Sequence, residues 1–249
     1  MAAARKERVL LKLSGAALLG QRPFGLDPPT LRNIARQLQR CHEAGFEMAV
    51  VVGGGNLFRG ATAAEAGFNR ATADYAGMLA TVINALALQD AIEAEGVQVR
   101  TMSALSLAQV AEPYIRRRAI RHLEKGRLVL FAAGTGNPYV TTDTAAALRG
   151  VEVGAQRLLM AKTGVDGVYT ADPAIDPTAA RYDTLSYRDA ITKRVQIMDT
   201  AALSLCEENH LPIVVFDIAP PDAIVRAVID GSAGTLVGTI PTKLTREAS

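Results

Sequence analysis

Four loops in this sequence carry residue types that could bind phosphate or a nucleotide. The first is Lys12-Leu13-Ser14-Gly15, which follows a short apolar run. The lysine supplies a point charge, and backbone N–H groups beside a glycine can donate to phosphate oxygens. A strand that simply ends on a solvent-facing lysine would show the same residues. Taken alone, this tetrapeptide fits that structural interpretation better.

The second loop, residues 53–60, opens with three consecutive glycines and contains Arg59. Glycines remove the Cβ atoms where a backbone would approach an anion, and a guanidinium can then clamp that anion with two hydrogen bonds. A tight turn would also explain the glycines. The arginine favours phosphate binding.

The third loop, residues 134–143, reads Gly-Thr-Gly-Asn-Pro-Tyr-Val-Thr-Thr-Asp. Thr141 and Thr142 place hydroxyls at the start of an expected helix, and Asp143 suits its first turn. Helix capping accounts for Thr142 and Asp143. It does not account for the Gly-Thr-Gly-Asn-Pro run before them.

The fourth loop, residues 163–173, follows an apolar strand and contains Tyr169 and Asp172 between two turns. These side chains could form the wall of a purine pocket. The alternative is that Asp172-Pro173 is an ordinary turn.

The elements around these loops alternate between short apolar runs and longer segments of helical periodicity. Strands are expected at residues 9–13, 48–52, 97–102, 128–132, 157–160 and 212–216, and helices at 29–44, 73–95, 115–125, 141–149, 200–210 and 221–230. This alternation predicts an α/β fold with a mostly parallel sheet covered by helices on both faces. Ligands bind at the carboxyl ends of such strands, where these loops lie. No linker divides residues 1–249, so we expect a single domain.

Composition and motif searches exclude several classes of protein. The chain has 27 Lys and Arg against 25 Asp and Glu, so no basic surface for nucleic acid is expected. No GxxxxGK[ST] is present, and both Gly-rich loops lack the third glycine of GxGxxG, which excludes a P-loop kinase and a Rossmann dinucleotide site. The three histidines are expected to be structural or solvated.

Cysteine content and hydropathy bear on where the protein works. Cys41 and Cys206 show no metal-binding spacing, so neither a metal site nor a disulfide is expected. The longest uncharged stretches, residues 75–89 and 128–142, are shorter than the ~18 to 20 residues that span a bilayer. We therefore expect a soluble protein of a reducing compartment, with no membrane partner.

Taken together, these segments resemble the amino acid kinase family, and within it the bacterial branch that phosphorylates uridylate (UMP). The likeness extends from Arg8 to about Gly238 and is carried by residues 11–15, 53–60, 74, 78–81, 134–143 and 165–173. The Gly-Thr-Gly-Asn-Pro run is specific to that branch. The lysine loop and the triple-glycine loop are shared with other members.

This resemblance implies a three-layer αβα sandwich with a mostly parallel central sheet, as in carbamate kinase-like folds. It places UMP toward the N-terminal part and ATP toward the C-terminal part, with Lys12 and Arg59 as catalytic residues. The ATP site is then expected at Lys12, Leu13, Ser14, Gly15, Gly55, Arg59, Thr163, Tyr169 and Asp172. The UMP site is expected at Gly54, Asp74, Thr135, Gly136, Asn137, Pro138, Tyr139, Val140, Thr141 and Thr142.

The resemblance also implies Mg²⁺ bound with ATP, and no protein metal ligand is assigned. It implies a cytoplasmic homohexamer in pyrimidine biosynthesis, activated by GTP and inhibited by UTP. The GTP-responsive segment is expected at Gly20, Gln21, Arg22, Pro23, Phe24 and Gly25. This segment has fewer glycines than in relatives, and Thr163 stands where some relatives carry Asn.

Two matters stay open from the residues alone. Asp74 precedes a long uncharged run, so it either caps that helix or accepts hydrogen bonds from the ribose hydroxyls of UMP. The chain as a whole could instead phosphorylate a carboxylate, as acetylglutamate or aspartate kinases do, or sense nucleotides without catalysis. A carboxylate kinase does not need residues 134–143 for a second nucleotide, and a sensor does not need both Lys12 and Arg59.

Overall fold

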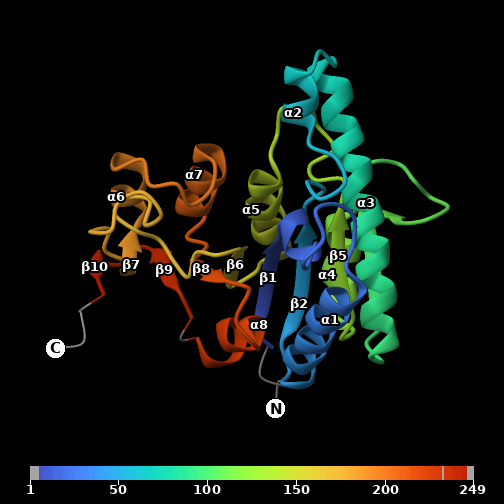
Figure 1. Cartoon of the computed structure of the whole chain (residues 1–249). Helices are drawn as coiled ribbons and strands as arrows, with labels where there is room; N and C mark the ends of the chain where they lie inside the picture. The colour runs from blue at the N-terminus through green and yellow to red at the C-terminus, as the bar shows by residue number, and fades with distance from the viewer. Residues whose placement is uncertain (1–5, 232, 246–249) are drawn as a thin grey trace.

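The structure, a computed structural model, describes residues 6–231 and 233–245 and is built on one ten-stranded sheet (Figure 1). The strands lie in the order β10-β7-β9-β8-β6-β1-β2-β5-β3-β4. Their bounds are β1 (Arg8–Leu13), β2 (Glu47–Val52), β3 (Val99–Ser103), β4 (Glu112–Pro113), β5 (Leu128–Ala132), β6 (Arg157–Lys162), β7 (Tyr182–Ser186), β8 (Ile213–Asp217), β9 (Thr235–Gly238) and β10 (Lys243–Leu244). Only the pairs β8–β9 and β10–β7 are antiparallel among the described strands. The prediction of a mostly parallel sheet is confirmed.

Helices cover both faces of this sheet. The longer ones are α1 (Pro28–Glu43), α3 (Arg70–Ala94), α4 (Arg116–Glu124), α5 (Thr142–Val153) and α7 (Thr200–Glu208). The shorter ones are η1 (Gly15–Leu18), α2 (Gly60–Glu65), α6 (Tyr187–Thr192) and α8 (Ala223–Val225), which continues into the π-helical turn η2 (Arg226–Asp230). Side chains at Asp27, Thr141 and Asp199 accept the first backbone N–H groups of α1, α5 and α7, and so determine where these helices begin.

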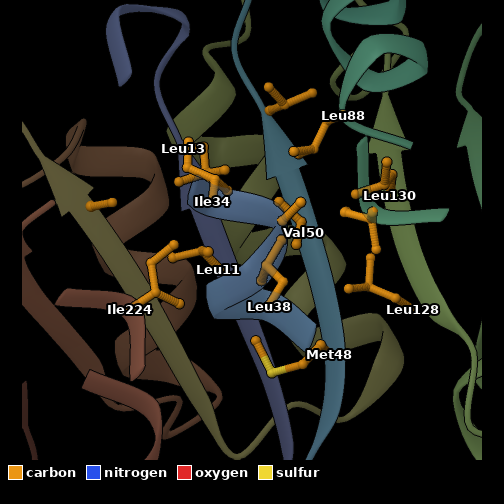
Figure 2. Close-up of a cluster of buried hydrophobic side chains, with 14 of the residues drawn as sticks. Leu11, Leu13, Ile34, Leu38, Met48, Val50, Leu88, Leu128, Leu130 and Ile224 are labelled. Atoms are coloured by element: carbon orange, nitrogen blue, oxygen red, sulfur yellow. The ribbon is translucent and has the colours of Figure 1, made fainter. Parts of the chain in front are cut away.

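Side chains along each strand alternate between the two faces of the sheet, so a separate hydrophobic core lies on each face. In β1, Val9, Leu11 and Leu13 pack with α1, α3 and α8, whereas Leu10 packs on the opposite face with α4, α5 and α7. Figure 2 shows the first core, with Leu11, Leu13, Ile34 and Leu38 around Val50. Successive strand residues point to opposite faces, so Lys12 lies on the same face as Leu10, toward α5.

The six strands and the first five helices expected from the sequence are present, with bounds shifted by a few residues. The strands β4, β7, β9 and β10 and the short helices η1, α2 and α6 were not predicted. Residues 182–186 form neither a continuous apolar run nor a strict alternation, because their positions are in turn buried, exposed, intermediate, buried and intermediate, so they carry no periodic strand signal. The helix expected at 221–230 is divided between α8 and η2.

By length and composition, α3 is the one helix in the described ranges that could cross a membrane. It is 25 residues long, and Met78, Val82 and Leu88 on its inner side belong to the sheet core. The core helix of a soluble protein passes the same test, and the packing of α3 is of that kind.

At the amino ends of β1 and β2, opposite the Gly-rich loops, a buried ion pair joins Arg8 to Glu47. Arg8 is 3% exposed, and its Nη2 lies 2.6 Å from the Glu47 carboxylate. Removing one partner of such a pair leaves an uncompensated buried charge, which costs about 3–5 kcal/mol. We therefore expect Glu47→Ala to lower the free energy of unfolding by about that amount, measured by urea denaturation.

Glu95→Ala is the matched control, because Glu95 pairs with Arg36, whose side chain is 66% exposed. Exposed pairs contribute about 0–1 kcal/mol, so this variant is expected to stay close to the parent protein. An equal loss of unfolding free energy in both variants would contradict the expectation that the buried Arg8–Glu47 pair stabilises the fold more than the exposed Arg36–Glu95 pair.

Candidate active site

The Gly-rich loops meet because four strands lie side by side and run parallel. These strands are β6, β1, β2 and β5, in that order across the sheet. The loops that follow them all leave the same edge, and they contain the residues singled out from the sequence. The pairing of strands thus brings together segments that lie from 39 to 148 residues apart in the chain, as in Arg8 with Glu47 and Val9 with Arg157.

At this edge a carboxylate lies against a buried cation. The ammonium group of Lys12, whose side chain is 11% exposed, lies 2.8 Å from Oδ1 of Asp143 in the first turn of α5. Lys162, at the end of the neighbouring strand β6, donates a hydrogen bond of 2.6 Å to the carbonyl of Ile197. Burial lowers the pKa of Lys162, Asp143 opposes that change, and Lys12 adds to it. Two ammonium groups and one carboxylate therefore form the centre of the site.

The first two Gly-rich loops approach each other too closely for side chains. A Cβ on Gly15 would lie 2.6 Å from the backbone nitrogen of Gly55, and one on Gly54 would lie 2.6 Å from the carbonyl oxygen of Gly77 in α3. Backbone packing thus explains the glycines at 15 and 54. Beside Gly55 the Arg59 side chain folds back, and its Nε donates to the Gly55 carbonyl at 3.2 Å.

A buried pair of amides holds the triple-glycine loop in place. Asn84 on α3 is fully buried, and its Nδ2 donates to the Gly53 carbonyl at 2.7 Å and to Oδ1 of Asn56 at 2.6 Å. Asn56 returns a hydrogen bond to Asn84 at 3.1 Å and donates to the carbonyl of Gly25 at 2.7 Å. The position of the loop is therefore set by α3 and by the segment that ends at Gly25.

These elements enclose a cavity of about 440 Å³, which we call the transfer cavity. It is lined by Gly54, Gly55, Phe58, Arg59, Gly60, Thr62, Arg70, Asp74, Gly77, Met78, Thr81, Gly134, Thr135, Val140, Thr141 and Thr142. The glycines and Arg59 come from the second loop, hydroxyl groups come from the third loop, and Asp74 on α3 lies beside Gly60, where a Cβ would be 2.6 Å from its Oδ1. Anion-binding groups and sugar-binding groups therefore line one space.

The third loop is held in an unusual backbone conformation. Ala133 and Tyr139 have φ angles of 61° and 67°, in the left-handed region. The hydroxyl of Thr81 on α3 accepts a hydrogen bond of 2.7 Å from the Ala133 nitrogen, and Thr141 caps α5. The Asp199 carboxylate at the start of α7 accepts a hydrogen bond from the Thr141 hydroxyl. Neighbouring elements thus fix the loop at both ends.

Asp74 does not cap α3, so that alternative from the sequence is wrong. The cap is Asn69, whose side chain accepts from Thr72. Asp74 lies one turn inside the helix, where its carboxylate accepts from Arg70 Nε at 2.9 Å and from the backbone nitrogen of Tyr139 at 2.8 Å. Its side chain is 15% exposed and lines the transfer cavity.

Several residues expected in the site do not line this cavity, among them Lys12, Leu13, Ser14 and Gly15 of the first loop. Gly136, Asn137, Pro138 and Tyr139 form the outer part of the third loop, with the Tyr139 side chain 69% exposed. Tyr169 donates to Asp166, and Asp172 accepts from the Ala174 nitrogen in a turn. Thr163 lines a different cavity, together with Gly20 and Gln21 of the segment expected to respond to GTP.

Sequence reasoning missed four residues of this region: Lys162, Asn84, Asp199 and the ion-pairing role of Asp143. Lys162 stands two residues past the predicted end of its strand, and Asn84 is a single polar residue in an apolar helical run. Asp143 and Asp199 both carry the signal of a helix start, which hides any second role. Only the packing of α5 on β1 reveals that Asp143 faces Lys12.

Comparison with known proteins agrees with this architecture. The model of the amino acid kinase family matches residues 7–217. The uridylate kinase of Limosilactobacillus reuteri is 53% identical over 230 residues, which cover 92% of this chain and 96% of that protein. The crystal structure of UMP kinase from Bacillus anthracis superposes with a TM-score of 0.93 at 39% identity, over 97% of this chain and 100% of the other. The uridylate kinase structure from Archaeoglobus fulgidus gives 0.73 at 28% identity, over 92% and 99%.

The chain therefore belongs to the amino acid kinase family, and it is an enzyme. Within that family it belongs with the uridylate kinases, because the identity to the L. reuteri protein extends over nearly the full length of both chains. The three-layer αβα fold that the sequence resemblance implied is confirmed.

The amide pair provides a test of how the glycine loop is positioned. Asn84→Leu removes the donors to Gly53 and Asn56 while keeping a similar volume, so we expect the loop to lose its alignment. The KM for ATP, the expected phosphoryl donor, should rise about tenfold, which corresponds to the loss of one to two hydrogen bonds. Steady-state kinetics measure the change in KM, and urea denaturation measures any loss of stability separately.

Asn209→Leu is the matched control, because Asn209 lies exposed at the end of α7 and bonds only to Leu205 among the described residues. If Asn84→Leu loses stability but keeps the parent KM for ATP, then the amide pair supports the fold without positioning the loop.

Proposed function

We propose that this chain transfers the γ-phosphoryl group of ATP to UMP, giving ADP and UDP. The observation that carries the proposal is the transfer cavity. Its lining combines the glycines and Arg59 with Asp74 and the Thr-rich third loop. A phosphoryl donor and a nucleotide acceptor need these two kinds of group around one space.

Charge neutralisation and alignment account for the chemistry. The UMP phosphate is already an ionised nucleophile at pH 7, so no general base is needed, and the barrier comes from bringing two polyanions into line. Lys12 and Lys162 supply positive charge at the carboxyl edge of β1 and β6, and Arg59 supplies it on the facing loop. Asp143 orients Lys12 through their ion pair.

Mg²⁺ fits this site as a companion of the ATP phosphates. Magnesium in kinases is held by substrate phosphates and one or two carboxylates, with the remaining ligands from water. Asp143 is the carboxylate beside Lys12 and would be the side chain to approach the ion. The ion would neutralise charge that develops on the transferred phosphoryl group.

We assign the two nucleotides as the sequence resemblance implied. Lys12 to Gly15, Gly55 and Arg59 would hold the ATP phosphates, with Thr163, Tyr169 and Asp172 toward the adenosine. Gly54, Asp74 and residues 135–142 would hold UMP. Asp74 supports this assignment because its carboxylate lines the cavity and would repel a phosphate, whereas ribose hydroxyls are natural donors to it.

The two alternative functions are less well supported. In a carboxylate kinase the acceptor is not a nucleotide, and the third loop of this chain would have no second phosphate and base to bind. A nucleotide sensor would gain nothing from a lysine buried against Asp143, because placing that charge out of water is costly.

Assembly, regulation and location belong to the same proposal. We infer a soluble cytoplasmic enzyme of pyrimidine biosynthesis that forms a homohexamer, is activated by GTP and is inhibited by UTP. An apolar stripe of Tyr75, Leu79 and Ile83, between 43% and 54% exposed on α3, supports assembly. Gly25 supports a regulatory role for residues 20–25, because it bonds to Asn56 beside the triple-glycine loop.

An acceptor panel tests the function directly. With ATP and Mg²⁺, we expect ADP release with UMP to exceed that with CMP, acetylglutamate or aspartate by at least about 100-fold, as a site built to hydrogen-bond one substrate rejects others. The control Lys12→Ala should lower kcat with UMP by about 10² to 10³, the effect of one charge-stabilising donor. Turnover with acetylglutamate or aspartate instead of UMP would reject the proposal, as would ATP binding without turnover of any acceptor.

Asp74→Asn separates the two substrates. Loss of a charged acceptor for the ribose hydroxyls is expected to raise KM for UMP about tenfold or more, from about 1.5–3 kcal/mol, and to leave KM for ATP nearly unchanged. The preference for UMP over 2′-deoxy-UMP should narrow in the same variant. Asp90→Asn, exposed on the same helix, serves as control. A fall in melting temperature with an unchanged KM for UMP would show that Asp74 only joins α3 to the third loop.

A further inference from the structure

A buried arginine on α5 lies beside the start of the third loop. Arg149 is 5% exposed, and its Nη2 donates a hydrogen bond of 3.3 Å to the carbonyl of Gly134. Gly134 is the first residue of that loop and lines the transfer cavity, whereas Arg149 does not line it. The loop continues into α5 at Thr142. The bond from Arg149 therefore joins the beginning of the loop to the helix that follows it.

Two neighbouring side chains hold Arg149 in one orientation. Its Nη1 donates to Oε2 of Glu152 at 2.6 Å, and its guanidinium carbon lies 3.7 Å from the centre of the Tyr114 ring. The Tyr114 hydroxyl donates to the same Glu152 oxygen at 2.6 Å. The Tyr114 ring also packs edge-on against Phe131 in β5, the strand from which the third loop departs. The guanidinium is thus fixed relative to the strand and the helix on either side of the loop.

The backbone that Arg149 contacts has a conformation that has to be held. Ala133 and Gly134 have φ angles of 61° and 57°, both in the left-handed region. This region is sterically unfavourable for a residue with a Cβ, so such a conformation persists only where neighbouring groups determine it. The Thr81 hydroxyl accepts from the Ala133 nitrogen on the α3 side of the sheet. Arg149 donates to the Gly134 carbonyl on the α5 side, so the bend is held from both faces.

A bond to the Gly134 carbonyl also fixes the N–H group of the next residue. The carbonyl and the N–H of a trans peptide lie in one plane and point in opposite directions. The N–H of Thr135 therefore points away from Arg149, and Thr135 lines the transfer cavity. Because the carbonyl accepts from a charged donor, the peptide is polarised and its N–H becomes a stronger donor.

We propose that Arg149 is a positioning residue for the acceptor nucleotide. Its guanidinium orients the Gly134–Thr135 peptide so that the Thr135 N–H is presented to the acceptor, and it orders residues 134–141 before the acceptor binds. Core packing alone gives no reason for this side chain, because an apolar residue of similar volume in place of a buried ion pair is often neutral or stabilising. The inference rests on the proposed function, since it concerns the acceptor side of that reaction.

Steady-state kinetics of Arg149→Leu test this role. We expect KM for UMP to rise about tenfold through the loss of the bond that orients the loop, while KM for ATP and kcat stay within about threefold of the parent values. A general loss of folded protein would lower the measured rate at every substrate concentration and would leave both KM values unchanged. The separation between the two substrates therefore distinguishes positioning from a merely structural role.

Arg157→Leu is the matched control, because Arg157 also combines one carboxylate with backbone carbonyls. Its Nε lies 2.6 Å from the Glu7 carboxylate, and its Nη2 donates to the Val228 carbonyl at 2.9 Å. Arg157 begins β6, at the edge of the sheet opposite the Gly-rich loops. This variant is expected to lose stability in urea and to keep the parent KM for UMP.

Hydrogen exchange followed by mass spectrometry gives a second measurement, which needs no substrate. In Arg149→Leu the amides within residues 133–141 are expected to exchange about tenfold faster than in the parent protein, because the loop opens locally more often. The same amides should exchange at the parent rate in Arg157→Leu. Tyr114→Phe replaces Arg149→Leu if the latter does not fold. It removes the hydroxyl that holds Glu152, so we expect an increase of about threefold in both the exchange rate and KM for UMP.

The two measurements separate this inference from the proposed function. If the parent protein does not phosphorylate UMP, the proposed function is rejected, and the exchange rates still decide whether Arg149 orders the loop. The role of Arg149 is overturned if residues 133–141 exchange at the parent rate in the folded variant. It is also overturned if KM for UMP stays at the parent value, rises equally in Arg157→Leu, or rises only together with KM for ATP.

Discussion

A lysine ammonium at the end of a buried strand must be compensated, and the arrangement of this molecule follows from that requirement. Lys12 stands at the carboxyl edge of β1, the strand paired on both sides by β2 and β6, and is almost closed off from solvent. Its charge is tolerable there because α5 begins with Asp143 pointing at it. The start of α5, capped by Thr141, is thereby tied to the end of β1. The third loop, which leads into α5, is brought to the same place.

The second constraint is close approach of backbones around that charge. Gly15 and Gly54 leave no room for a side chain because the lysine loop, the triple-glycine loop and α3 are in direct contact. The Asn56–Asn84 pair then satisfies the buried polar groups that this contact creates. A site formed in this way is organised before substrate arrives. Such preorganisation is the main requirement of a transfer reaction that depends on alignment and electrostatics.

Helix α3 links several parts of this arrangement. Its inner face belongs to the sheet core, its fully buried Asn84 positions the triple-glycine loop, and Thr81 and Asp74 hold the third loop. Its outer face exposes Tyr75, Leu79 and Ile83. Contact made on that outer face would act on a helix that contacts both of these loops, which gives assembly a direct physical route to the active site.

The sequence by itself determined the alternation of strands and helices, the parallel central sheet and the loops in which the site lies. The spacing of apolar residues and the glycines between elements encode these features, and the order of the motifs made the family recognisable. Only the tertiary structure decided that Asp143 pairs with Lys12, that Lys162 lies on the same face of the sheet and that Asn84 holds Gly53. These contacts join residues that are 31 positions apart for Asn84 and Gly53 and 131 apart for Lys12 and Asp143, or depend on which face of a strand is covered. Strand register and helix packing select them from many pairs of the same residue types, and no local pattern carries that information.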